Sequence, residues 1–177
     1  ADLKSGQAWL RGAPYALTSL PGWSFSRALA AYGETSGGVL VPFASGAPRL
    51  VPGRGQLIEG ARTNLCLRSQ EFDNASWTKV SCASAADQYT APDGTTTMDR
   101  LLASAGNASH YATQSFTWTA AIHAVSYFVR YVNHQYFQIT TWDGTTSRYV
   151  NFDVQNGTVG TASGASGFIY AVSGGYR

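Results

Sequence analysis

The chain has 177 residues, of which 12% are charged and 13% aromatic, and its formal net charge is +2. This length allows one buried core and an appendage. The small net charge, without a Lys or Arg run, argues against nucleic acid as a partner. No apolar stretch is long enough to predict insertion in a membrane. The first residues lack an apolar signal core, so we expect synthesis in a cytoplasm.

Residues 1–60 combine many glycines with most of the prolines, and their apolar runs are short. Because proline is rarely tolerated in central strands, this region is predicted to be an irregular, extended Pro/Gly-rich N-terminal arm with short edge strands and hairpins. Its aromatic side chains, which include Trp9, Trp23 and Phe43, require a surface that buries them. The arm's own sandwich and a neighbouring subunit are both candidates for that surface.

From residue 61 onward, short β-branched and aromatic runs alternate with turn signals. Residues 92–94, 142–144 and 155–157 predict turns, because Asp, Asn and Gly tolerate positive φ. No segment shows a helical stripe. We therefore predict an all-β fold, an antiparallel β-sandwich of the jelly-roll type, over residues 61–177. Its strands are expected at 64–67, 76–80, 88–90, 97–102, 110–118, 124–132, 136–142, 147–154, 158–161 and 167–172.

Alternation along three of these strands assigns each a core face and a mixed face. The predicted core residues are Val125, Tyr127, Val129, Phe137, Ile139, Val150, Phe152 and Val154.

The opposite face combines aromatic rings with amide and guanidinium groups, which bind sugars by stacking and hydrogen bonding. An ordinary polar sheet surface, or a face that packs under the arm, would show the same pattern. The candidate carbohydrate-binding residues are Phe128, Arg130, Tyr136, Gln138, Trp142, Tyr149 and Asn151.

Two cysteines, Cys66 and Cys82, are too few for a disulfide framework. We expect them to be small buried side chains, with a disulfide between them as the alternative. Zinc would require more Cys or His residues at close spacing. No metal or cofactor is therefore predicted. A structural Ca²⁺ stays open but is not predicted, because no acidic cluster has the spacing of a calcium loop.

Residues 56–65 read QLIEGARTNL and resemble the L-I-E-x-A-R-T-N-L stretch of the phage head-spike and tail-fibre domain family. Residues 68–79 resemble that family's S-x-x-F-x-N-x-x-W-x-K, and residues 91–101, 152–159 and 174–177 resemble its later motifs. The family, which also occurs in prophages and gene transfer agents, carries a jelly roll like that of carbohydrate-binding modules. Tyr176 stands where the family usually has Trp. The family's strand continues beyond Arg177, so we expect an open sheet edge that a partner or missing residues complete.

The first of these motifs lies at the junction between the arm and the sandwich. Polar groups that become buried there need hydrogen-bond partners. The junction residues are Glu59, Arg62, Thr63 and Asn64. We predict that a Glu59–Arg62 pair, with Asn64 capping main-chain groups, locks the arm to the sandwich. Trp77 is predicted to belong to the core. A structural role for these residues is favoured over ligand binding.

The resemblance implies a structural virion component: a head spike, fibre or tail-tip protein of a phage or phage-like particle. Such a component is assembled in the host cytoplasm and exposed on the particle surface, and the arm would anchor it. Its implied partners are other virion proteins of the capsid, tail or baseplate, further copies in a trimer or ring, and a host-surface polysaccharide.

Two alternatives to this function are a purely structural collar, plug or baseplate subunit and a capsule-depolymerising enzyme. The enzyme is disfavoured because the chain has three histidines, no G-x-S-x-G motif, and carboxylates that lie mostly in turn or junction motifs. We therefore expect no catalytic residues.

Overall fold

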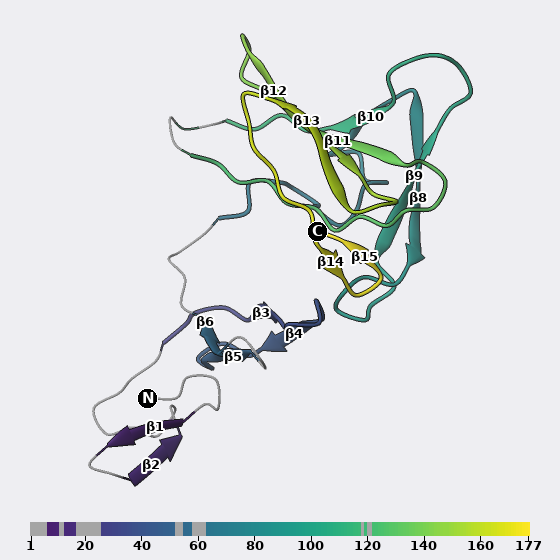
Figure 1. The fold of residues 1–177 in the computed structure, drawn as a ribbon. Coiled ribbons are helices and arrows are strands. Elements are labelled where there is room, and N and C mark those ends of the chain that lie inside the picture. Colours follow the sequence, from purple (N-terminus) through teal and green to yellow (C-terminus); the bar gives the residue numbers. More distant parts are fainter. Residues whose placement is uncertain are drawn as a thin grey trace. The chain divides into compact units, whose positions relative to one another are not determined.

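The computed structural model describes residues 7–10, 13–16, 26–51, 55–57, 63–117, 119 and 122–177. All regular elements within these ranges are β-strands, and every pairing between them is antiparallel (Figure 1). The all-β antiparallel prediction is therefore confirmed. The chain separates into two compact units, Ala1–Arg62 and Thr63–Arg177.

The described residues of the first unit form three short antiparallel hairpins. They are formed by β1 (Gln7–Leu10) with β2 (Ala13–Ala16), β3 (Ala31–Glu34) with β4 (Leu40–Phe43), and β5 (Arg49–Val51) with β6 (Gly55–Leu57). Pro42 is accommodated in β4 because that strand pairs on one side only. Val51 is buried and lies directly against Gly33, where a side chain on the glycine would collide with it.

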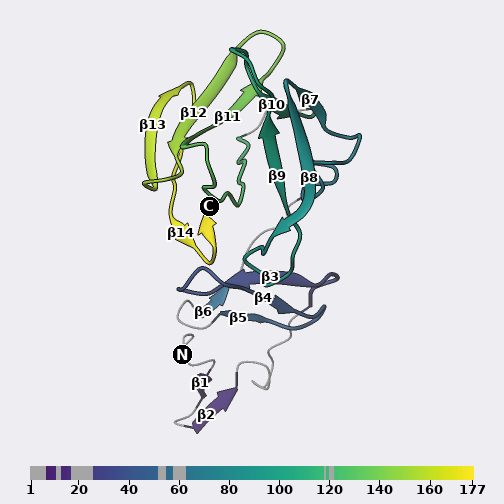
Figure 2. The same ribbon diagram turned by 90° about the vertical axis from the view of Figure 1, so that its right-hand side faces the viewer.

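The described residues of the second unit form nine strands, of which β11, β12 and β13 make a three-stranded sheet. In Figure 2 this sheet lies opposite the β8–β9 ribbon, so that the unit has two layers, while its jelly-roll connectivity stays a prediction. The strands are β7 (Thr78–Val80), β8 (Cys82–Tyr89), β9 (Met98–Ala103), β10 (Tyr111–Thr113), β11 (Tyr136–Trp142), β12 (Ser147–Asp153), β13 (Thr158–Ser163), β14 (Ala171–Val172) and β15 (Gly175–Tyr176).

The core of this unit lies under β12. Val150, Phe152 and Val154 are buried as predicted, and Phe137 and Ile139 of β11 pack against them. A series of contacts between aromatic rings extends this core. The distances between ring centroids are 4.5 Å for Trp77 and Phe72, 6.3 Å for Phe72 and Tyr127, and 6.1 Å for Tyr127 and Phe137. These contacts join the loop before β7 to the three-stranded sheet.

The three predicted turns are confirmed. Gly94, Gly144 and Gly157 have φ angles of +85°, +92° and +68°, a region that glycine enters without a steric penalty. Gly144 closes the β11–β12 hairpin, and Gly157 closes the β12–β13 hairpin.

Several predicted strands are wrong or too long. Residues 64–67 form no strand. Their main-chain groups bond side chains instead: Gln114 Oε1 accepts from Leu67 N at 3.0 Å, Gln114 Nε2 donates to Leu67 O, and Asn64 Oδ1 accepts from Cys66 N. Residues 124–132 contribute a single bridge, between Val129 and Tyr176. The predicted core residue Val125 is 41% exposed, which corrects its assignment. Among the described residues of 110–118 only β10 is a strand, and of the predicted strand 88–90 the first two residues form the end of the longer β8.

The two cysteines are free thiols and only half-buried. Cys82 Sγ donates to Tyr111 O at 3.2 Å, and burial raises the pKa of the Cys66 thiol. The disulfide alternative is therefore not formed.

Candidate functional site

The register of β11 and β12 places most of the candidate residues on one face of the sheet. Tyr136, Gln138 and Trp142 lie opposite Asp153, Asn151 and Ser147, and Thr140 lies opposite Tyr149. Residues directly opposite one another in a sheet share a face. We call this surface the mixed face; it consists of Tyr136, Gln138, Thr140 and Trp142 of β11, Ser147, Tyr149, Asn151 and Asp153 of β12, and Thr161 of β13.

Two aromatic rings stand at the ends of the mixed face. Tyr136 is 72% exposed and Trp142 is 59% exposed. Burial of such large aromatic side chains would be favourable in free energy, so their exposure is notable. They lie six residues apart on β11, a separation of about 20 Å along an extended strand. Rings exposed in this way can stack against the apolar face of a sugar.

Between the rings, four polar side chains form a hydrogen-bonded row across all three strands. Thr140 Oγ1 donates to Gln138 Oε1 at 2.7 Å, and Gln138 Nε2 donates to Asn151 Oδ1 at 2.8 Å. Asn151 Nδ2 in turn donates to Thr161 Oγ1 at 2.7 Å. These bonds hold both amides in one orientation and leave each with one N–H and one oxygen lone pair. The row, which we call the amide row, thus presents both donors and acceptors.

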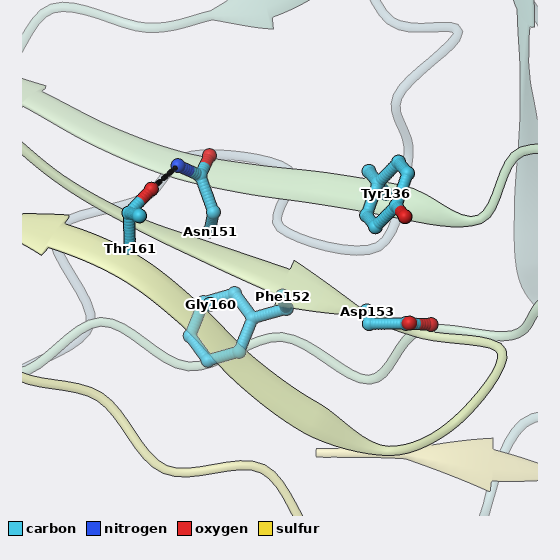
Figure 3. Close-up of a pocket in the computed structure, with 6 residues that line it drawn as sticks. All are labelled: Tyr136, Asn151, Phe152, Asp153, Gly160 and Thr161. Carbon is cyan, nitrogen blue, oxygen red and sulfur yellow. Dashed lines mark hydrogen bonds between the residues drawn. The ribbon is translucent and has the colours of Figure 1, made fainter.

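A depression of about 320 Å³ opens beside Tyr136 at this end of the sheet (Figure 3). A register shift between Val150 and Phe152 displaces β13 there. Gly160 lines the depression, and a Cβ on it would lie 3.4 Å from the Cβ of Asn151. The residues that line the depression are Tyr136, Asn151, Phe152, Asp153, Gly160 and Thr161.

The carboxylates of Asp143 and Asp153, at the two ends of the face, accept hydrogen bonds within the turns that follow β11 and β12. Asp143 accepts from Thr145 N, Thr146 N and Arg148 Nη1, and the bond from Arg148 is the largest of the causes that lower its pKa to about 2. Asp153 accepts from Gln155 N, from the main chain and side chain of Asn156, and from Gln135. The side-chain bond from Asn156 is the largest of the causes that lower the pKa of Asp153. Both groups are therefore ionised at neutral pH.

Phe128 and Arg130 lie elsewhere in the unit. The guanidinium of Arg177 is 5.4 Å from the ring of Phe128, and the guanidinium of Arg130 is 4.9 Å from the ring of Tyr89 on β8. Because residues 124–132 do not form a strand beside β11, the structure does not bring these two candidates to the mixed face.

Of the predicted junction residues, Glu59 and Arg62 lie outside the described residues, and Thr63 is exposed. Asn64 Oδ1 accepts from Cys66 N at 3.0 Å, so Asn64 caps a main-chain group within the second unit, while its predicted role in locking the arm to the sandwich stays a prediction. Trp77 is only 4% exposed, in agreement with its predicted place in the core.

The polar groups around Trp77 are engaged in holding the loop over residues 68–79. Trp77 Nε1 donates to Arg68 O at 2.9 Å. Lys79 Nζ lies within 3.2 Å of four main-chain carbonyls of this loop. Asp99 of β9 accepts from the main-chain nitrogens of Phe72 and Asp73. These hydrogen bonds give Trp77, Lys79 and Asp99 a structural role in holding the loop.

The candidate binding residues did not include Thr140, Ser147, Asp153, Gly160 or Thr161. Alternation alone places Thr140, Ser147 and Asp153 on the mixed face, because they continue it along β11 and β12. It does not place Gly160 and Thr161, because their place depends on the register shift between β12 and β13.

Within the described part of the chain, no group of three or more His, Cys, Asp and Glu side chains is arranged to hold a metal ion. No helix among the described residues is long and apolar enough to cross a membrane. Comparison with known proteins finds no significant match among family models, curated proteins or solved structures.

Proposed function

We propose that the chain is a structural virion component of a phage or phage-like particle, and that its mixed face binds a host-surface glycan. One observation carries the glycan part of the proposal: Tyr136 and Trp142 are held exposed at the two ends of an ordered amide row. Sugar sites combine such rings with amide and hydroxyl partners. The virion part is supported by the motifs at residues 56–65 and 68–79 that resemble the phage head-spike and tail-fibre family.

A binding role is favoured over hydrolysis by the chemistry of the nearby carboxylates. A glycosidase needs a carboxylic acid that stays protonated near neutral pH, and therefore a raised pKa. The pKa values of Asp143 and Asp153 are lowered, because turn and side-chain donors stabilise the charged forms. These two groups suit turn formation better than proton transfer.

The glycan proposal is tested by binding of the full chain to an array of microbial glycans and to bacterial cells. Trp142→Ala removes one of the two rings and is expected to weaken binding at least tenfold. Phe168→Ala is the matched control, because Phe168 is an aromatic residue that is 84% exposed outside the mixed face. Absence of binding by the unmodified chain to every glycan and cell would refute the proposal.

An assembly subunit that contacts only other virion proteins is the second candidate. It is favoured by large apolar side chains that the second unit exposes, such as Leu67 at 67%, Ile122 at 102% and Phe168 at 84%. Exposed apolar groups are common in protein interfaces. The two candidates differ in where binding occurs, so immunogold labelling of intact particles together with the glycan array separates them. Deletion of residues 1–55 is expected to release the chain from particles if this region anchors it.

A further inference from the structure

We infer that the mixed face selects an uncharged polysaccharide and excludes chains that carry carboxylate or phosphate groups. This inference rests on the proposed glycan-binding function and specifies its ligand class. It follows from the distribution of charge and of unused hydrogen-bonding capacity over β11, β12 and β13.

The charge on the mixed face is negative. Among the nine described residues that form it, Asp153 is the one that is charged at neutral pH. Its hydrogen-bond partners are amide and main-chain N–H groups, which order the carboxylate but do not cancel its charge. A sugar carboxylate placed in the depression beside Tyr136 would therefore meet a like charge, since Asp153 lines that depression.

The cation closest in sequence to this face is already paired. Arg148 belongs to β12, but alternation directs it to the opposite face, and its Nη1 lies 2.6 Å from Asp143 Oδ2 at the end of the hairpin. Arg130 and Arg177, which could otherwise receive an anion, stack over Tyr89 and Phe128. None of the guanidinium groups of Arg130, Arg148 and Arg177 is therefore in position to bind an anionic sugar on the mixed face.

The amide row matches the chemistry of neutral sugars instead. Sugar hydroxyls both donate and accept, and Gln138 and Asn151 each offer one unused N–H and one unused lone pair. Because Thr140 and Thr161 hold the two amides at each side, the amides are ordered before a ligand arrives, which reduces the entropy lost on binding. The rings of Tyr136 and Trp142 supply stacking at both ends of this row, along the direction of β11.

The inference is tested by titrating the full chain with neutral and anionic polysaccharides at two salt concentrations. Suitable neutral probes are dextran, a β-glucan and a galactan; suitable anionic probes are polysialic acid, alginate and a teichoic acid. We expect binding to at least one neutral polymer, with an affinity that changes less than about twofold between low and high salt, because no charge pair forms. The anionic polymers are expected not to bind.

Asn151→Leu tests the amide row itself. The substitution keeps a side chain of similar size on β12 but removes the bonds to sugar hydroxyls, and we expect an affinity loss of about tenfold for the neutral polymer. Asn107→Leu is the matched control, because it makes the same substitution at an exposed residue of the second unit outside the mixed face. Equal binding by Asn151→Leu and the unmodified chain would overturn the role of the row.

The outcomes separate this inference from the function on which it rests. Binding only to anionic polymers, weakened by salt and by Trp142→Ala, would overturn the inference and leave glycan binding standing. Binding to no polymer, array glycan or cell would overturn the proposed function itself.

Discussion

Trp77 and Trp142 belong to the same unit, but substitution by alanine is expected to destabilise the unit at Trp77 and to leave its stability nearly unchanged at Trp142. Trp77 is 4% exposed, whereas Trp142 is 59% exposed. A buried tryptophan removes about 150–250 Å² from water, which at about 25 cal/mol per Å² corresponds to about 4–6 kcal/mol. Large-to-small changes of this kind cost about 3–5 kcal/mol in measured cores. We therefore expect Trp77→Ala to lower the free energy of unfolding by that amount, and Trp142→Ala to change it by less than about 0.5 kcal/mol.

Trp77→Phe separates packing from hydrogen bonding at the same position. It retains a ring against Phe72 but removes the donor to Arg68 O, which also accepts from Glu71 N. Because that carbonyl keeps one partner, the lost bond is expected to cost only about 1 kcal/mol.

The assay for these three variants is urea unfolding of the full chain, followed by hydrogen exchange of peptides that contain β12, which reports on the second unit alone. A loss below about 1 kcal/mol for Trp77→Ala, or an equal loss for Trp142→Ala, would refute the reasoning.

Two further predictions concern the turns. Gly157 and Gly94 both have positive φ, so alanine should cost each about 1–2 kcal/mol in backbone strain; only at Gly157 would the new Cβ also lie 2.6 Å from Tyr176 Cε1. Gly157→Ala is therefore expected to unfold at lower urea than Gly94→Ala, and equal midpoints would contradict the predicted clash. The pKa of Asp143 is lowered from 3.8 to about 2, so the stability that it contributes is present above pH 4 and lost as the pH falls through 2. NMR titration of its carboxyl carbon should give a midpoint near 2; a midpoint near 4 would show that the bond to Arg148 does not persist in solution, and Asp143→Asn should abolish this acid dependence.

The β11–β12 hairpin was predictable from sequence because three signals agree there. Its strands alternate apolar and polar residues, its turn has Asp143 followed by Gly144, and the alternation continues to the buried Val154. One residue of slippage would expose the core side chains, so the register is strongly specified.

Residues 64–67 and 124–132 were not predictable in the same way. Both segments have apolar alternation. Alternation indicates which side chains share a face, but it does not indicate which other strand pairs with the segment. Leu67 is held by Gln114, 47 residues later, and Val129 by Tyr176. Such distant pairings leave no local signal in the chain.

The candidate site was likewise predictable in part. Tyr136, Gln138 and Trp142 were found with Tyr149 and Asn151 because the two strands that carry them are consecutive and paired. Alternation wrongly predicts Phe128 and Arg130 on this face, because residues 124–132 have the pattern of a strand but do not form one beside this hairpin.

The residues that carry the family resemblance and the residues that could bind a ligand are separate sets. In the loop over residues 68–79, Trp77, Lys79 and their partner Asp99 bind main-chain groups of that loop, and these contacts account for their residue types. The unused hydrogen-bonding capacity lies instead on Gln138 and Asn151, in strands outside this loop. The contacts of this loop therefore explain the motif without reference to a ligand. If the mixed face binds a glycan as proposed, its specificity depends on the side chains of β11 and β12 and not on this loop.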